Sequence, residues 1–364
     1  MKIHTITCHD VYNLGASLQA YALAAYLAEA GHEVSILDYK PPYLSRHYAL
    51  SYVANPRYDK PLLRQAYLLA KLPKRLWALR SRRKKRFDAF RRGYLPVTPR
   101  RYVSAEDLKA NCPPSDLFIA GSDQIWNPTF ENGKDPAFFL TFVPQGAKKI
   151  AYAASFAVET LSEADVARMK PWLTALDAIA VREQSGVTIL DGMGLPAVCT
   201  VDPVFLLPRE NWERLSVLPK VRDYILVYDF DGNPLLRRFA REKAKAEGRR
   251  LVSVFPMEGA DAVWGDMGPR EFLGAIQNAA CVISNSFHAT AFSLIFERDF
   301  YVFGRKEHIN TRMADLVADV GLCVRLVIDP DGGEASPIPW SSVREALGRR
   351  IGESSAYLLL HTKG

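Results

Sequence analysis

The residue of this chain best placed for chemistry is a histidine between a strand and a helix. Residues 281–284 form an apolar run that predicts a buried strand, and residues 290–296 have helical apolar spacing. Asn285 and Ser286 between them are turn and cap residues. Because ligands of open parallel sheets bind at the carboxyl ends of strands, we expect His288 at a site. There it can transfer a proton or hold an anion at the helix N-terminus, unless it is a satisfied structural histidine.

A polar loop, residues 121–128, directly follows a second predicted strand, residues 116–120. Small and polar residues placed after a buried strand usually form an exposed part of a site. Asp123 is the acidic residue of this loop and could cap it. Trp126 is either a platform on which a sugar stacks or part of the core. The other polar side chains of the loop are Ser122, Gln124 and Asn127.

The loop of residues 9–15 follows the first predicted strand, residues 2–8, and contains Asp10, Asn13 and Gly15. It lacks the full glycine pattern of a dinucleotide site. We therefore expect a compact loop that lets a ligand approach the backbone.

Cations at other strand ends suit an anionic ligand. Arg182 follows the predicted strand 178–181, and its planar guanidinium can grip a carboxylate in bidentate fashion. The alternative is an ion pair with Glu183 or Asp202. Three further cations follow the predicted strand 300–303, namely Arg305, Lys306 and Arg312.

The elements that carry these residues alternate between strands and helices, which is the signature of parallel sheets. We predict an α/β fold of two Rossmann-like, doubly wound domains with a cleft between them. The predicted boundaries are 1–207 and 222–335, followed by a C-terminal helix within 336–364 that packs back on the N-terminal domain.

Composition limits the class of protein. The 364 residues are 48% hydrophobic and 24% charged, as in globular proteins. Five scattered cysteines, without a CxxC pair or zinc-spaced histidines, indicate free thiols in a reducing cytoplasm and no metal site. No signal-peptide core and no spanning apolar run is present, so we expect a cytoplasmic protein, soluble or attached to the inner face of the membrane.

The net charge of +7 is concentrated in one segment. Residues 71–92 hold eleven Lys and Arg and one Asp, a local charge of +10, so the remaining residues sum to 7 − 10 = −3. The segment is either a solvated amphipathic helix or a contact with an anionic membrane surface or lipid-linked substrate. Nucleic acid is disfavoured because no nucleic-acid module accompanies the charge.

Residues 121–127 (Gly-Ser-Asp-Gln-Ile-Trp-Asn) resemble a signature of the polysaccharide pyruvyl transferase family. Other segments resemble the family in the same order; they are 13–15 with 18–23, 181–183 with Ser185, 201–203, 286–290, and Asn310 with Arg312. The resemblance implies a two-domain fold like that of GT-B glycosyltransferases. It also implies transfer of a pyruvyl group from phosphoenolpyruvate to a sugar, with ketal formation and release of phosphate, in cell-surface polysaccharide synthesis without a cofactor.

The resemblance assigns roles to these positions. The implied reaction needs a proton donor, for which we choose His288; its alternative role is to hold the phosphate. Asp10 or Asp123 could act as base on the sugar hydroxyl, and Asp123 is favoured because it lies in the more specific motif, although both could equally cap the loop. Some members carry Arg-Leu-His-Gly where this chain has residues 286–289, so other cations must replace that arginine. We expect donor contacts from Arg182, Ser286, Phe287, His288, Arg305, Lys306 and Arg312. We expect acceptor contacts from Asp10, Asn13, Gly15, Ser122, Gln124, Trp126 and Asn127.

Two other functions compete with this prediction. A nucleotide-sugar glycosyltransferase of the same fold requires a ribose-binding carboxylate in the C-terminal half, for which Glu258 and Asp261 are the candidates. The second alternative, a non-catalytic protein that binds anions or nucleic acid, is supported only by the basic segment of residues 71–92. The expected partners are phosphoenolpyruvate and a glycan or lipid-linked oligosaccharide.

Overall fold

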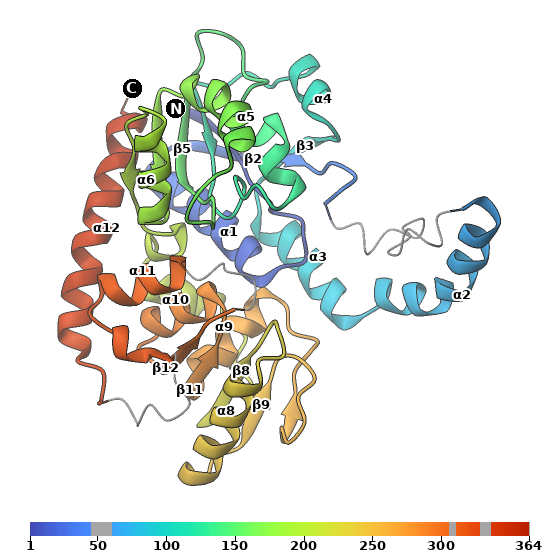
Figure 1. The fold of residues 1–364 in the computed structure, drawn as a ribbon, viewed down its shortest axis with the longest axis vertical. Coiled ribbons are helices and arrows are strands. Elements are labelled where there is room, and N and C mark those ends of the chain that lie inside the picture. Colours follow the sequence, from blue (N-terminus) through green and yellow to red (C-terminus); the bar gives the residue numbers. More distant parts are fainter. Residues whose placement is uncertain (45–59, 306–310, 328–335, 364) are drawn as a thin grey trace.

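The computed structural model describes residues 1–44, 60–305, 311–327 and 336–363, which form two α/β domains (Figure 1). The N-terminal domain has a seven-stranded parallel sheet in the order β3-β2-β1-β4-β5-β6-β7. Its strands are β1 (Lys2–Ile6), β2 (Glu33–Tyr39), β3 (Val97–Tyr102), β4 (Leu117–Ala120), β5 (Lys148–Ala154), β6 (Ala178–Val181) and β7 (Val198–Cys199). Its helices are α1 (Leu14–Glu29), α2 (Pro61–Leu79), α3 (Arg82–Tyr94), α4 (Ala105–Ala110), α5 (Glu163–Thr174) and α6 (Gln184–Gly192).

The C-terminal domain has a six-stranded parallel sheet in the order β10-β9-β8-β11-β12-β13. Its strands are β8 (Tyr224–Tyr228), β9 (Leu251–Ser253), β10 (Ala262–Val263), β11 (Ala279–Ser284), β12 (Asp299–Phe303) and β13 (Leu326–Val327). Its helices are α8 (Pro234–Glu247), α9 (Pro269–Gln277), α10 (Phe287–Ile295) and α11 (Thr311–Asp319), and α7 (Arg209–Leu215) precedes it.

Strand order places the functional loops. In each sheet the chain first builds outward on one side and then returns to the other side of its first strand, between β1 and β4 and between β8 and β11. At such switch points the loops after neighbouring strands diverge and leave a crevice for a ligand. The loops after β1, β4 and β11 are those that the sequence singled out.

Local sequence explains why the helices at these crevices begin where they do. The Asn13 side chain accepts a hydrogen bond from the Ala16 backbone N–H at 3.2 Å and caps α1. Ser286 caps α10 in the same way, through the Ala289 N–H at 3.4 Å. The helix therefore begins at Phe287 and not at residue 290 as predicted, which places His288 in its first turn.

Aromatic side chains continue the apolar core from one domain into the other. The ring of Trp212 in α7 lies 5.7 Å from Tyr21 of α1 and 4.9 Å from Phe292 of α10, measured between centroids. Trp212 is fully buried and belongs to a cluster that includes residues of both sheets. This packing fixes α1 and α10, which carry site residues from opposite domains.

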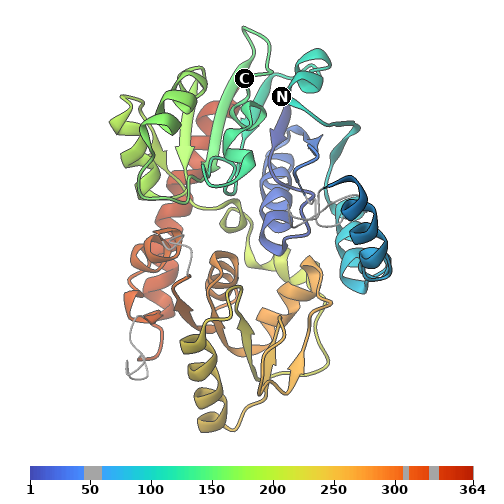
Figure 2. The same cartoon turned by 45° about the vertical axis from the view of Figure 1, so that its right-hand side comes forward.

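The last helix, α12 (Trp340–Thr362), runs along both domains (Figures 1 and 2). Near its C-terminus the Tyr357 hydroxyl donates to the Ala151 carbonyl at 2.9 Å, and the Ser354 hydroxyl accepts from the Val201 N–H at 2.9 Å. Toward its N-terminus, Arg350 pairs with Asp319 of α11 at 3.2 Å. The final helix thus contacts the sheet in which the chain began.

The basic segment forms parts of two helices with different surroundings. Helix α3 packs on the body, with Phe87 and Phe90 buried, and Arg83 donates to the Tyr12 and Met267 carbonyls. Helix α2 projects away from both sheets (Figure 1). Residues 71–92 are therefore not one uniform solvated helix.

Candidate functional site

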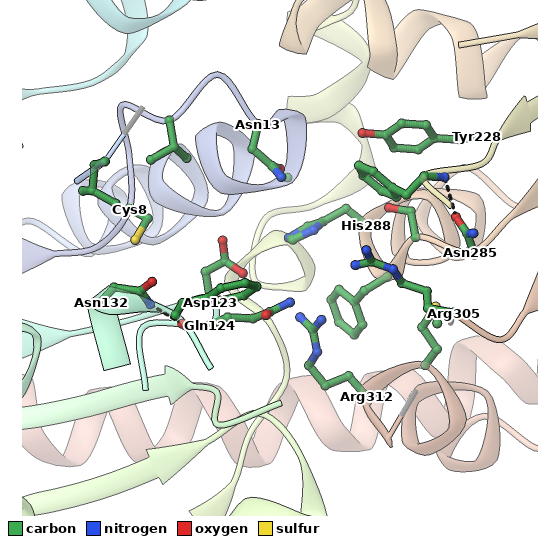
Figure 3. A pocket seen from close by; sticks show the side chains of 18 residues that line it. Cys8, Asn13, Asp123, Gln124, Asn132, Tyr228, Asn285, His288, Arg305 and Arg312 are labelled. Atoms are coloured by element: carbon green, nitrogen blue, oxygen red, sulfur yellow. Dashed lines mark hydrogen bonds between the residues drawn. The ribbon is translucent and has the colours of Figure 1, made fainter. Parts of the chain in front are cut away.

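A pocket of about 340 Å³ lies where the switch points of the two domains face each other (Figure 3). Its walls come from the loops after β1, β4 and β11 and from the start of α11. The lining residues are Cys8, Val11, Asn13, Gly15, Leu44, Asp123, Gln124, Phe130, Asn132, Tyr228, Phe230, Asn285, Ser286, Phe287, His288, Arg305, Arg312 and Met313.

The ring of His288 is held between the two domains. A Cβ atom added to Gly15 would lie 2.0 Å from His288 Nδ1, so only glycine leaves room for the ring over the first turn of α1. On its other side, His288 Nε2 lies 3.6 Å from Asp202 Oδ2. The side chain is 10% exposed and lines the pocket. This arrangement holds the ring in the wall of the pocket, with Nε2 buried and without a hydrogen-bond partner among the described residues.

Asp202 is the buried acceptor on which several groups converge. Its carboxylate accepts from the Val204 N–H at 3.1 Å, lies 3.4 Å from the Ser122 hydroxyl oxygen, and pairs with Arg182. Burial alone would raise the pKa of the Asp202 carboxyl, but the Arg182 guanidinium and His288 outweigh it and hold the pKa well below its usual range. Asp202 is thus a buried anion that orients His288.

Arg182 is neutralised inside the protein. Its guanidinium pairs with Asp202, lies 3.5 Å from Asp123 Oδ1, and stacks 4.6 Å from the centroid of the Phe287 ring. The alternative that the sequence left open, an ion pair with Asp202, is the arrangement observed, although it is buried and not on the surface. A donor contact by Arg182 stays a prediction.

Arg312 is a buried cation in the pocket wall, and its charge is not neutralised by any of the described residues. No carboxylate of the described chain lies within ion-pair distance, and its Nε has no hydrogen-bond partner. Its Nη1 lies 3.2 Å from the Gln124 amide, which accepts when its oxygen faces the guanidinium. Burial and the nearby Arg182 lower the pKa of Arg312 to about 10. An anionic ligand would supply the missing charge.

The other predicted donor residues lie around this guanidinium. The Phe287 ring contacts both arginines, with the Arg182 Cζ 4.6 Å and the Arg312 Cζ 5.8 Å from its centroid. Ser286 caps α10 and lines the pocket. Arg305 lines it too and forms a fork with Asp231, at 3.3 Å from Nε and 3.2 Å from Nη2. Lys306 lies outside the described residues.

The predicted acceptor residues separate into two layers. Asn13, Gly15, Gln124 and the candidate base Asp123 line the pocket. Beneath them, Ser122 donates to the Ala153 carbonyl at 3.0 Å, and the Asn127 side-chain oxygen accepts from the Thr129 hydroxyl at 2.6 Å; Ser122 and Asn127 are both fully buried. For the four lining residues, contact with an acceptor stays a prediction.

Two acceptor assignments need correction. Trp126 is 0% exposed, stacks on Phe139 with centroids 5.4 Å apart, and donates to the Phe138 carbonyl, so it belongs to the core and cannot stack on a sugar. Asp10 does not line the pocket; it pairs with Lys40 at 2.7 Å and Arg101 at 3.1 Å at the other side of the loop.

Sequence reasoning missed several lining residues from the second domain and from a distant loop. Tyr228 and Phe230 lie at the end of β8, Asn285 lies after β11, and Asn132 lies after the β4 loop. The Asn285 amide oxygen accepts from the Phe230 N–H at 2.9 Å and ties these two loops together. The strand-end position of Tyr228 was the available signal.

The chemistry available to the pocket comes from side chains and helix N-termini. The described residues contain no cluster of acidic, histidine and cysteine side chains able to hold a metal ion. None of their helices has the length and apolarity to cross a membrane. Glu258 and Asp261, the candidate ribose ligands, do not line the pocket. The site pairs an unneutralised cation with a fixed histidine and a carboxylate.

Comparison with known proteins identifies family and fold. The family model for polysaccharide pyruvyl transferase matches residues 13–307. A search of curated proteins found no sequence that matches this chain. A UDP-GlcNAc 2-epimerase from Methanocaldococcus jannaschii is 10% identical, with a TM-score of 0.50 over 99% of this chain and 100% of that one. The Neisseria meningitidis epimerase is also 10% identical, with a TM-score of 0.48 over 100% and 95%.

Spinosyn forosaminyltransferase, a further solved structure, is 17% identical, with a TM-score of 0.44 over 99% of this chain and 94% of that one. The Methanocaldococcus jannaschii epimerase, at a TM-score of 0.50, has the GT-B type of fold, and this chain likewise has two Rossmann-like domains with parallel sheets. The predicted α/β fold of GT-B type is confirmed.

Proposed function

Because the chain belongs to the polysaccharide pyruvyl transferase family, we propose that it transfers the pyruvyl group of phosphoenolpyruvate to a sugar. The product is a ketal across two hydroxyl groups of that sugar, and phosphate is released. No cofactor or metal takes part in this scheme.

The observation that carries the donor assignment is the unneutralised Arg312 guanidinium. Phosphoenolpyruvate is compact and highly anionic, so its pocket needs cations or helix N-termini. Arg312 supplies a buried cation, and the first turn of α10, capped by Ser286, presents backbone N–H groups to the same pocket. These groups would hold the phosphate or carboxylate in place of the arginine that some family members carry near His288.

In the proposed reaction, His288 donates a proton to the methylene carbon of phosphoenolpyruvate, which leaves an oxocarbenium-like centre at the neighbouring carbon. One sugar hydroxyl attacks this centre, and a second hydroxyl then displaces phosphate. The two sugar hydroxyls release two protons. One of them restores the proton that His288 gave to the new methyl group, and the other leaves with the phosphate. Asp123 is the proposed base, since its carboxylate lines the same pocket.

The proposed acceptor is a glycan that enters from the N-terminal side of the pocket. Asn13, Gln124 and Asn132 offer amide groups there, and amides can both donate to and accept from sugar hydroxyls. We propose that this glycan is lipid-linked and destined for a cell-surface polysaccharide. The protein would then work in the cytoplasm at the inner face of the membrane.

The test is phosphate release from phosphoenolpyruvate by the full chain, with a panel of free and lipid-linked glycans. We expect acceptor-dependent release by wild type, none by His288→Gln, and normal release by His32→Gln, a histidine far from the pocket. Thermal protection without acceptor reports donor binding separately. Protection by a nucleotide sugar but not by phosphoenolpyruvate would reject the pyruvyl donor in favour of glycosyl transfer.

A further inference from the structure

A second cavity, of about 620 Å³, lies outside the cleft on the edge of the C-terminal domain. It is bounded by the start of α3, by the connection from α7 to β8, and by β10 with the residues that follow it. We call it the α3 groove. None of its lining residues lines the pocket described above.

The α3 groove gathers large apolar side chains that are exposed to water. Val217 is 38% exposed, Leu218 48% and Val263 47%, and half-buried Trp264 lies beside them. Single exposed apolar side chains are common on soluble proteins, but several in one cavity mark an interaction surface.

Unpaired cations border the same cavity. Arg82 and Lys220 are exposed, and no carboxylate of the described chain lies within ion-pair distance of either. Arg86, by contrast, pairs with Glu271 at 3.1 Å, and Asp266 is the other carboxylate of the lining. The free charges at the rim are therefore mainly positive, and they lie next to exposed apolar side chains.

Helix α2 continues the combination of positive charge and exposed apolar side chains beyond the groove. It ends three residues before Arg82, and between Lys60 and Phe87 the sequence has eleven Lys and Arg and no Asp or Glu. Leu63 and Leu69 on α2 are exposed, and no other described element packs extensively against the helix. In Figures 1 and 2, α2 projects from the body on the side of α3.

We propose that the α3 groove and α2 together form a docking surface for an anionic phospholipid bilayer. Apolar side chains with a cationic border, continued by an amphipathic cationic helix, match the interfacial zone of such a bilayer, where chains meet phosphates. A protein partner or a second copy of this chain would need acidic side chains to match the cations. This inference does not depend on the donor or on the reaction proposed above.

The docking surface also lies close to the entrance of the cleft. Arg83 of α3 donates to the Tyr12 carbonyl, one residue before the cap of α1, and to the Met267 carbonyl in the wall of the groove. Helix α3 thus lies between the proposed bilayer contact and the pocket. A lipid-linked acceptor would therefore reach the site from the membrane over a short path.

The test is co-sedimentation of the full chain with vesicles of neutral phosphatidylcholine, with and without 30% phosphatidylglycerol. We expect binding only to the anionic vesicles, weakened by salt. Val263→Asp should lower the partition coefficient by about tenfold, because it places a charge in the apolar part of the contact. Lys220→Glu should lower it by about tenfold as well, since it reverses one charge near the lipid phosphates.

The matched control is Val198→Asp. Val198 is also a valine on a two-residue edge strand and is 47% exposed, but it lies on β7 of the other domain. It should bind as wild type does, and all variants should keep the wild-type circular dichroism spectrum. Equal binding to neutral and anionic vesicles, or equal loss with Val198→Asp and Val263→Asp, overturns the proposal. So does a concentration-dependent dimer in solution that Val263→Asp abolishes.

Discussion

Replacing Arg312 with glutamine should separate donor binding from folding. The guanidinium is buried without a carboxylate, and burial together with Arg182 lowers its pKa by more than two units, to about 10. At about 1.4 kcal/mol per tenfold change in proton affinity, the charged form carries a penalty of about 3 kcal/mol in the ligand-free protein. Arg312→Gln removes this penalty, while it loses stacking on Phe287 and contact with Gln124, worth about 1–2 kcal/mol together.

The free energy of unfolding of ligand-free Arg312→Gln should therefore equal or exceed that of wild type. Binding of phosphoenolpyruvate should weaken by about 30- to 3,000-fold, since losing a buried charged hydrogen-bond partner costs about 2–5 kcal/mol. Urea unfolding measures the first quantity, and calorimetric titration with phosphoenolpyruvate measures the second.

Arg182→Gln is the matched control, because it removes the same group from an ion pair. It leaves Asp202 buried without its cation and should cost about 3–5 kcal/mol of unfolding free energy. If Arg312→Gln destabilises the protein as much as Arg182→Gln does, the guanidinium is structural. If it leaves the affinity for phosphoenolpyruvate unchanged, the donor does not bind there.

Three further substitutions test the surroundings of the site. Gly15→Ala places a methyl group 2.0 Å from the present position of His288 Nδ1, so kcat should fall by about 100-fold while the protein stays folded; an unchanged kcat would show that the ring position is unimportant. Asp202→Asn should cost about 3–5 kcal/mol at pH 7 in urea unfolding. Because the folded pKa of Asp202 lies below its unfolded value, its stabilisation is complete above about pH 4 and is lost as the pH falls through the folded pKa. The gap between Asp202→Asn and wild type should therefore narrow below pH 4, and a constant gap would contradict this assignment. Trp126→Ala should lower unfolding free energy by about 3–5 kcal/mol, and a rise in acceptor KM without loss of stability would restore the stacking role.

Sequence alone could predict the sheet edges and the residues at them. Asp123 and His288 follow buried strands by three and four residues, and Gly15 lies nine residues after the end of β1; the strand ends of a parallel sheet meet at one edge. Their presence in one pocket follows from this rule together with the two-domain fold. The polar loops in the sequence therefore predict the position of the site.

The burial of Trp126 and the pairing of Arg182 could not be predicted from the sequence, because both depend on residues far along the chain. The Trp126 ring is buried by Phe139 and Phe156, and the Arg182 charge is neutralised by Asp202. No local pattern distinguishes an exposed tryptophan from one that a later segment covers. The opposite states of Arg182 and Arg312, one paired and one not, likewise depend on the tertiary fold.

The course of the chain has a mechanical consequence. It passes from the N-terminal to the C-terminal sheet before β8 and returns through α12, so two covalent crossings join the domains and define one hinge axis. On the C-terminal side, α12 makes exposed ion pairs such as Arg344 with Glu297, whereas on the N-terminal side its Ser354 is buried and bonded to the backbone. Breaking an exposed ion pair costs a free energy of only about 0–1 kcal/mol. Opening of the cleft would also have to separate buried side chains, such as Val343 of α12, from the apolar core that both domains share, so the two crossings and this core together resist it.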